Sequence, residues 1–262
     1  MEWDALFSAH VIFIEKSMLL EVACFSLEGA IIAEKAGAQR IELCSSPLEG
    51  GLTPSLAMIK GVRKLVSIPV FVMIRPREGD FLYTGREFES MLEDVAMVKD
   101  QGMDGVVSGA LLPDGSVDAE RTEKLVLAAS PMQVTFHRAF DLTRDPVSAL
   151  QDIIGTGAKR ILTSGQKQTA MEGKEMIASL VKAAADRICI MPGSGVNPSN
   201  IEMLAAVTGA SEYHASARKI VRGAMQYLNP DVSLHAGTAF RDNSLLLPDA
   251  QQIREMLSCL VK

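Results

Sequence analysis

Eight short runs of β-branched and apolar residues recur along this chain, and each is followed by a stretch with the pattern of an amphipathic helix. Their starts lie 21 to 36 residues apart, which leaves room for one helix between consecutive strands. Strands that alternate with helices are joined by crossovers and form a parallel sheet. The eight runs are Leu19–Ser26, Arg40–Ser45, Pro69–Pro76, Gly105–Leu111, Gln133–Phe140, Arg160–Gly165, Ile188–Val196 and Ser211–Arg218.

Start and stop signals flank the helices between these runs. Ser26 can cap the first helix, and three further sites pair a capping side chain with proline at the first helical position. These sites are Thr53-Pro54, Asp145-Pro146 and Asn197-Pro198. Glycines stand where helices should end. They are Gly37, Gly102, Gly157 and Gly209.

A short internal repeat favours closure of the sheet. The segment at 37–41, GAQRI, reappears as GAKRI at 157–161, four units later. A repeat related by half a barrel, in a chain of 262 residues, predicts a single-domain α/β fold of the (β/α)₈ TIM-barrel class with a closed parallel sheet of eight strands. A doubly wound open sheet is the alternative, but no Gly-x-Gly-x-x-Gly turn follows the first run.

Two segments fall outside the regular scheme. Residues 1–17 precede the first strand as an extension, and the barrel is expected to occupy 18–262, so the extension should be dispensable. Residues 219–247 form a long, mostly polar excursion after the eighth strand. An excursion at this place is either a lid over the site or a surface for contacts between subunits.

Composition excludes several classes of protein. The net charge is −6 and no block of Lys and Arg is present, so nucleic acid is not an expected partner. No apolar stretch is long enough for a bilayer, and the first residues do not read as an export signal. The four cysteines are widely spaced without a CxxC, which favours reduced thiols in a soluble, cytoplasmic protein. No organic cofactor motif is evident.

Charged residues interrupt several of the apolar runs. Glu21, Glu42, Arg75 and His137 come from four different strands and are the candidate catalytic residues. Charged side chains that enter a barrel from separate strands are tolerable only if they meet, so we expect them in one pocket at the carboxyl ends. The structural alternative is an ion-pair layer in which Glu21 and Glu42 neutralise Arg75.

Further basic side chains could hold a carboxylate or phosphate at the same face. Arg77, Arg138 and Arg218 are the candidates, and His214 could exchange protons there. The seventh run ends in a glycine turn, Gly193-Ser194-Gly195, before the expected cap at Asn197. Such a turn either presents backbone N–H groups to an anion or serves only as a tight turn.

Several segments resemble the copper homeostasis protein CutC family. They are LEVACFS (20–26), RIELC (40–44), EGGLTPS (49–55), PVFVMIRPREGDF (69–81), VTFHRAFD (134–141), RILTSG (160–165) and EYHASAR (212–218). The resemblance implies a (β/α)₈ barrel, a cytoplasmic location, frequent homo-oligomerisation and a role in copper tolerance or Cu(I) handling. It also implies copper ligands among cysteines near the ends of the first two strands.

This chain departs from the family pattern at the first cysteine. Cys44 matches the second cysteine, but Ala23 stands where members carry the first, and Cys24 follows it. If Glu21 and Glu42 point inward, alternation sends Ala23 and Cys44 inward and turns Cys24 outward. The expected thiol pair is then broken, and a lone Cys44 would need a methionine or histidine to hold Cu(I).

Two classes of function therefore remain. One is cytosolic Cu(I) binding or trafficking, with copper as the partner. The other is an enzyme acting on a small anionic molecule through the Glu, Arg and His residues at the strand ends. A purely structural scaffold is disfavoured, because charged strand ends seldom stabilise a core better than apolar residues do.

Overall fold

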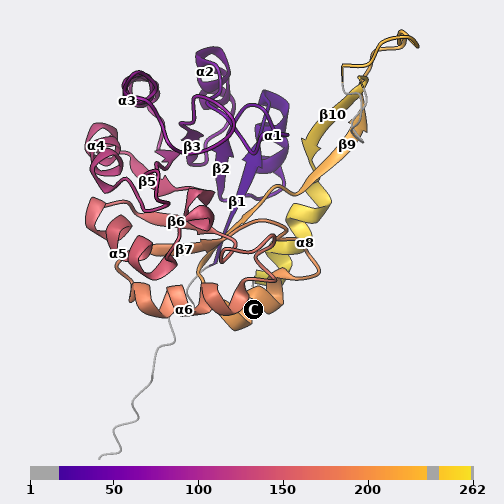
Figure 1. The fold of residues 1–262 in the computed structure, drawn as a ribbon. Helices are drawn as coiled ribbons and strands as arrows, with labels where there is room; N and C mark the ends of the chain where they lie inside the picture. The colour runs from indigo at the N-terminus through magenta and orange to yellow at the C-terminus, as the bar shows by residue number, and fades with distance from the viewer. Residues whose placement is uncertain (1–17, 235–241, 261–262) are drawn as a thin grey trace, which may run out of the picture.

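Eight parallel strands, ringed by helices, are arranged as a barrel in the computed structural model (Figure 1), which describes residues 18–234 and 242–260. Each expected run contains one strand, shorter than the run itself. The strands are β1 (Leu19–Cys24), β2 (Arg40–Leu43), β3 (Val70–Met73), β4 (Gly105–Ser108), β5 (Gln133–Phe136), β6 (Arg160–Thr163), β7 (Cys189–Pro192) and β8 (Glu212–Ala215).

The order of the strands confirms the TIM-barrel prediction. Hydrogen-bonded neighbours run β7-β6-β5-β4-β3-β2-β1-β8, and β7 and β8 at the two ends of this order also lie against each other. The sheet is therefore nearly closed, and the doubly wound alternative is wrong. The outer helices are α1 (Leu27–Lys35), α2 (Leu56–Leu65), α3 (Gly85–Asp100), α4 (Ala119–Ala129), α5 (Pro146–Thr156), α6 (Lys174–Ala184), α7 (Ile201–Thr208) and α8 (Ala250–Leu260).

Two of the four expected helix caps are confirmed. The Ser26 hydroxyl accepts a hydrogen bond from the Gly29 N–H at the start of α1, and Asp145 caps α5 with proline after it. Gly157 and Gly209 end α5 and α7 in the left-handed conformation, as predicted. Gly37 and Gly102, likewise at positive φ, follow the ends of α1 and α3.

The other two expected caps are wrong for a local reason. The cap of α2 is Ser55, because the Thr53 hydroxyl accepts instead from the Arg75 N–H at 2.9 Å and ties the loop to the end of β3. The carboxamide of Asn197 accepts from the Ser199 N–H in a turn, and α7 begins only at Ile201.

Alternate strand residues face two different environments. Leu20, Val22 and Cys24 of β1 belong to the large apolar core between the sheet and the helices. The barrel interior holds a small apolar cluster of Cys44, Phe71, Met73 and Val107 together with charged side chains.

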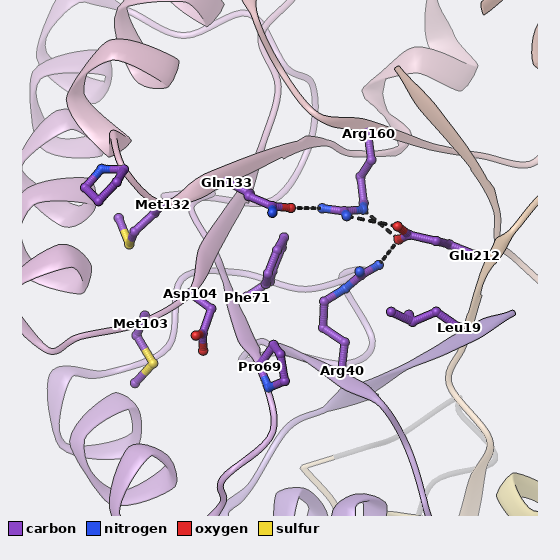
Figure 2. A pocket seen from close by; sticks show the side chains of 11 residues that line it. Leu19, Arg40, Pro69, Phe71, Met103, Asp104, Met132, Gln133, Arg160 and Glu212 are labelled. Atoms are coloured by element: carbon purple, nitrogen blue, oxygen red, sulfur yellow. Dashed lines mark hydrogen bonds and ion pairs between the residues drawn. The ribbon is translucent and has the colours of Figure 1, made fainter. Parts of the chain in front are cut away.

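An ion network fills the amino end of the interior, where Arg40, Glu212 and Arg160 meet (Figure 2). Glu212 Oε2 lies 2.5 Å from Arg40 Nη2 and 2.8 Å from Arg160 Nε, and both guanidinium groups lie over the Phe71 ring. Arg40 also pairs with the fully buried Glu21. A cavity of about 550 Å³ opens at this end. Because both arginines there are paired with carboxylates, we interpret this end as a structural layer.

The excursion after β8 contains a β-hairpin rather than an irregular loop. β9 (Arg218–Arg222) pairs antiparallel with β10 (Ser244–Pro248), and the hairpin extends away from the barrel (Figure 1). Residues 1–17, 235–241 and 261–262 lie outside the described residues, so the dispensability of 1–17 stays a prediction. Across the described ranges, we find no helix with the length and apolar character to cross a bilayer.

Replacing Glu212 by Gln should lower the free energy of unfolding by about 3 kcal/mol, because two buried arginines lose their shared carboxylate. Breaking a buried ion pair usually costs about 3–5 kcal/mol. We expect the lower end of this range, since the Glu212 side chain is 17% exposed. Urea unfolding measures the change. The matched control is Glu89→Gln on the exposed face of α3, for which a change within about 0.5 kcal/mol is expected. Equal changes in the two variants would contradict a structural role for the network.

Candidate functional site

A second cavity, of about 100 Å³, lies at the carboxyl ends of the strands. Of the four predicted catalytic residues, Glu42, Arg75 and His137 line it, and Glu21 does not. The site is therefore assembled from β2, β3, β5, β6 and β8 or the turns that follow them. Its lining residues are Glu42, Gly50, Met73, Arg75, Phe81, His137, Arg138, Leu162 and His214.

Glu21 supports the site from within the barrel. One carboxylate oxygen pairs with Arg40, and the other, Oε1, lies 2.8 Å from His214 Nδ1. Burial acts to raise the pKa of Glu21, but Arg40 and His214 outweigh it and hold that pKa at about 2. The structural alternative, in which Glu21 neutralises Arg75, is therefore wrong, because Arg40 is the partner of Glu21.

Glu42 is the carboxylate that reaches the cavity. Its Oε2 accepts a hydrogen bond from the Cys44 thiol at 3.4 Å and lies 3.9 Å from His214 Nε2. Its Oε1 is buried and has no hydrogen-bond partner. Burial and the nearby Glu21 carboxylate raise the pKa of Glu42 against the opposing effect of His214. Burial would lower the pKa of His214, but Glu42 and Glu21 raise it.

His137 is held by its backbone in one tautomer. It follows β5 and caps a short 3₁₀ helix, Arg138–Leu142, where its Nδ1 accepts from the Ala139 N–H at 3.2 Å. The ring proton must then lie on Nε2, which is buried and has no partner. Burial and the Arg75 cation lower the pKa of His137 to about 3, so the ring is neutral. Gly109 gives the ring room, since a Cβ there would lie 2.8 Å from Nδ1.

Arg75 is a buried cation held by backbone carbonyls. Its Nη1 donates to the carbonyls of Glu49 and Gly51, and its Nη2 donates to that of Gly79. The guanidinium carbon lies 5.0 Å from the centre of the Phe81 ring. Its Nε is buried without a partner. The Nε–H group of this cation is therefore left without a protein acceptor.

The three other arginines predicted for anion binding have different positions. Arg138 lines the cavity and pairs with Asp141 at 2.7 Å. Arg77 pairs with Asp80 and Glu87 and does not line the cavity. Arg218 is an exposed residue of β9. Of these three arginines, Arg138 alone lines the cavity, so anion binding there stays a prediction for Arg138.

The glycine turn after β7 is shaped by packing. A Cβ on Gly193 would lie 2.4 Å from the Leu162 side chain, and the Gly193 N–H is already bonded to the Thr163 carbonyl. Ser194 and Gly195 both have positive φ, and the Ser194 hydroxyl donates to the Gln168 carbonyl. Because α7 starts only at Ile201, the expected helix N-terminus is not at this turn. The tight-turn alternative fits better than an anion-binding turn.

The cysteines lie as the alternation of β1 and β2 predicts. Cys44 faces the barrel interior beside Met73, whereas Cys24 belongs to the outer core, with Ala23 one residue before it. Burial raises the pKa of both thiols, and the Glu42 carboxylate adds to each effect.

Sequence reasoning missed Arg40, Arg160, Glu212 and Met73. The signal for Arg40 was available, because it lies two residues before Glu42 and shares its face. Arg160 occupies the corresponding place in the repeated segment.

Oxygen and nitrogen ligands also meet at the centre of the barrel. Glu21, Glu42 and His214 each offer one ligand atom, and these atoms lie within 4.8 Å of one another. Both carboxylate oxygens of Glu21, however, already bind Arg40 and His214.

Comparison with models of protein families shows to which family this chain belongs. The model of the CutC family matches residues 18–219, from the start of β1 to the start of the hairpin. This chain belongs to the CutC family. Curated relatives include the copper homeostasis protein cutC homolog of Mus musculus, 45% identical over 91% of this chain and 88% of the mouse protein. The human homolog is 44% identical to this chain, and the match covers 87% of the human protein.

Solved structures agree with this membership. The CutC protein of Streptococcus agalactiae is 32% identical, with a TM-score of 0.73 over 76% of this chain and 98% of that one. Phosphoribosylanthranilate isomerase from Thermotoga maritima matches with a TM-score of 0.56 at 13% identity, over 93% of this CutC-family chain and 98% of the isomerase. At that identity the likeness concerns the barrel fold alone.

The two described histidines should behave differently in a pH titration. His137 should stay neutral with its proton on Nε2 between about pH 5 and 8, because its pKa is far below this window. His214 should keep its proton to a higher pH than an ordinary histidine, because its pKa is raised. Proton–nitrogen NMR of the ring nitrogens, assigned with His137→Gln and His214→Gln, measures both. A His137 ring that titrates within the window would contradict the site described above.

Proposed function

We propose that this CutC-family chain binds Cu(I) inside its barrel through Cys44 and Met73. The observation that carries the proposal is the convergence of the two side chains beside Gly51. The Cys44 sulfur lies 3.1 Å, and the Met73 methyl carbon 3.5 Å, from the point that a Cβ on Gly51 would occupy. Thiolate and thioether are both soft ligands of the kind that Cu(I) prefers.

Because Ala23 stands where the family has its first cysteine, the proposed site needs Met73 as its second sulfur ligand. A thiol pair across β1 and β2 would need a cysteine at position 23, because Cys24 points into the outer core. Met73 is on β3, the other neighbour of β2, and supplies a sulfur from that side. The names of the mouse and human relatives, copper homeostasis proteins, support the same cargo. We place the activity in the cytoplasm, since all four cysteines are free thiols.

Competition against a Cu(I) chelator under anaerobic, reducing conditions tests the proposal. Cys44→Ser should weaken binding by about 100-fold or more, and Met73→Leu by about tenfold, or about 1.4 kcal/mol. Ala23→Cys should tighten binding, because it adds an inward thiol on the adjacent strand.

Two controls accompany these variants. Cys24→Ser removes a thiol of the outer core, and Met91→Leu removes a buried methionine on α3, so neither should change affinity. Loss of binding in Cys24→Ser, or no binding in wild type, would overturn the proposal.

A second candidate function is an enzyme acting on a small anion in the cavity of about 100 Å³. The observation that favours it is a set of three buried polar atoms without partners, His137 Nε2, Arg75 Nε and Glu42 Oε1. Buried polar groups are normally satisfied, so unpartnered atoms on three residues that line one cavity favour a ligand there. Saturable binding of oxalate, measured by calorimetry, is the direct test of this function.

A further inference from the structure

We propose that this cavity takes a small 2-oxo acid and that Glu42 removes a proton from the carbon next to its carbonyl group. His137 and Arg75 would hold the two oxygens of the substrate. The inference rests on the second candidate function, the binding of a small anion, and adds the substrate class and the reaction.

The donors of the cavity match two adjacent oxygens. His137 and Arg75 both line the cavity, and each has one buried N–H group without a hydrogen-bond partner. A 2-oxo acid presents a carbonyl oxygen and a carboxylate oxygen side by side, so it can accept from both. The cation of Arg75 suits the carboxylate, and the neutral imidazole suits the carbonyl.

The tautomer of His137 fixes its role in the reaction. Because Nδ1 accepts from the Ala139 N–H, Nε2 is a donor before any substrate enters. A neutral imidazole that donates can polarise a carbonyl and stabilise the negative charge that forms on its oxygen. It needs no change of protonation to do so.

Glu42 supplies the matching acceptor. Glu42 lines the cavity, and its Oε1 is buried without a hydrogen-bond partner, whereas Oε2 accepts from the Cys44 thiol. This contact holds the carboxylate in place and leaves one oxygen for a C–H group of the substrate. Such positioning of a base against its proton is what general base catalysis requires.

Size and charge restrict the ligand further. A cavity of about 100 Å³ has the volume of roughly three waters at about 30 Å³ each, which suits a molecule the size of pyruvate. A phosphate dianion would be repelled by the Glu42 carboxylate in the same space. The charge of Arg138, at the rim, is already paired with Asp141.

The step conserves atoms and electrons without any co-reactant. Glu42 Oε1 forms a bond to the proton, the electron pair of the C–H bond becomes the new C=C bond, and the carbonyl π pair moves onto oxygen. The product is an enolate held by His137 and Arg75. Return of a proton from Glu42 to carbon restores the 2-oxo acid. His214, whose Nε2 lies 3.9 Å from Glu42 Oε2, would exchange protons between this carboxyl group and solvent.

Deuterium exchange tests the step with pyruvate as the probe. The full chain is incubated with pyruvate in D₂O containing EDTA, which suppresses exchange catalysed by free metal, and the methyl protons are followed by NMR. Wild type should exchange them above the rate of buffer alone. Glu42→Gln should lower the enzymatic rate by about 100-fold or more and still bind oxalate, because the donors remain.

Two further variants sharpen the test. His137→Asn should lower exchange by about 100-fold and weaken oxalate binding, because it removes the Nε2 donor. His137→Asn also tests the proposal if Glu42→Gln does not fold. Glu89→Gln, on an exposed helix face, should behave as wild type.

The outcomes separate the inference from the function on which it rests. If wild type does not bind oxalate, the binding function fails and the inference fails with it. If wild type binds oxalate but does not exchange pyruvate, the proton-abstraction step is overturned and the binding function stands. Unchanged exchange in Glu42→Gln would remove Glu42 from the role of base.

Discussion

The ion network inside the barrel is the constraint on which the rest of the site depends. Glu21, Arg40, Glu212 and Arg160 occupy the interior where most barrels place apolar layers. Arg40 pairs with one carboxylate oxygen of Glu21, and the second oxygen lies next to His214. Charged side chains thus follow one another from the amino end of the strands to the cavity at the carboxyl end. There, Glu42 is buried next to His214 rather than next to an arginine.

Strand alternation decides which sulfur atoms belong to the site. Cys24 and Cys44 are neighbours along the paired strands, yet one lies among the helices and the other inside the barrel. A shift of the first cysteine by one residue therefore changes the available ligands completely. In the proposed copper site, Met73 would supply the second sulfur, because it stands on β3, the other neighbour of β2. Copper binding and acid–base chemistry would then share the mouth of the barrel, with Cys44 hydrogen-bonded to Glu42.

The sequence was enough to predict the eight strands, the barrel and the inward faces of Glu42 and Cys44, because these follow from periods and spacing. It was not enough to pair the charges. Arg75 was expected to meet the carboxylates, but its partners are backbone carbonyls contributed by loops whose course no periodicity encodes. The tautomer of His137 was also beyond sequence reasoning, since it depends on one backbone N–H in a 3₁₀ turn.

We propose that the side chains turned into the barrel at its carboxyl end, and not Cys24, form the functional site. Anomalous diffraction at the copper edge, from crystals soaked anaerobically in Cu(I), tests this claim most directly. We expect a copper peak between the sulfur atoms of Cys44 and Met73. A peak at Cys24, among the outer helices, or no ordered copper in the barrel would contradict it.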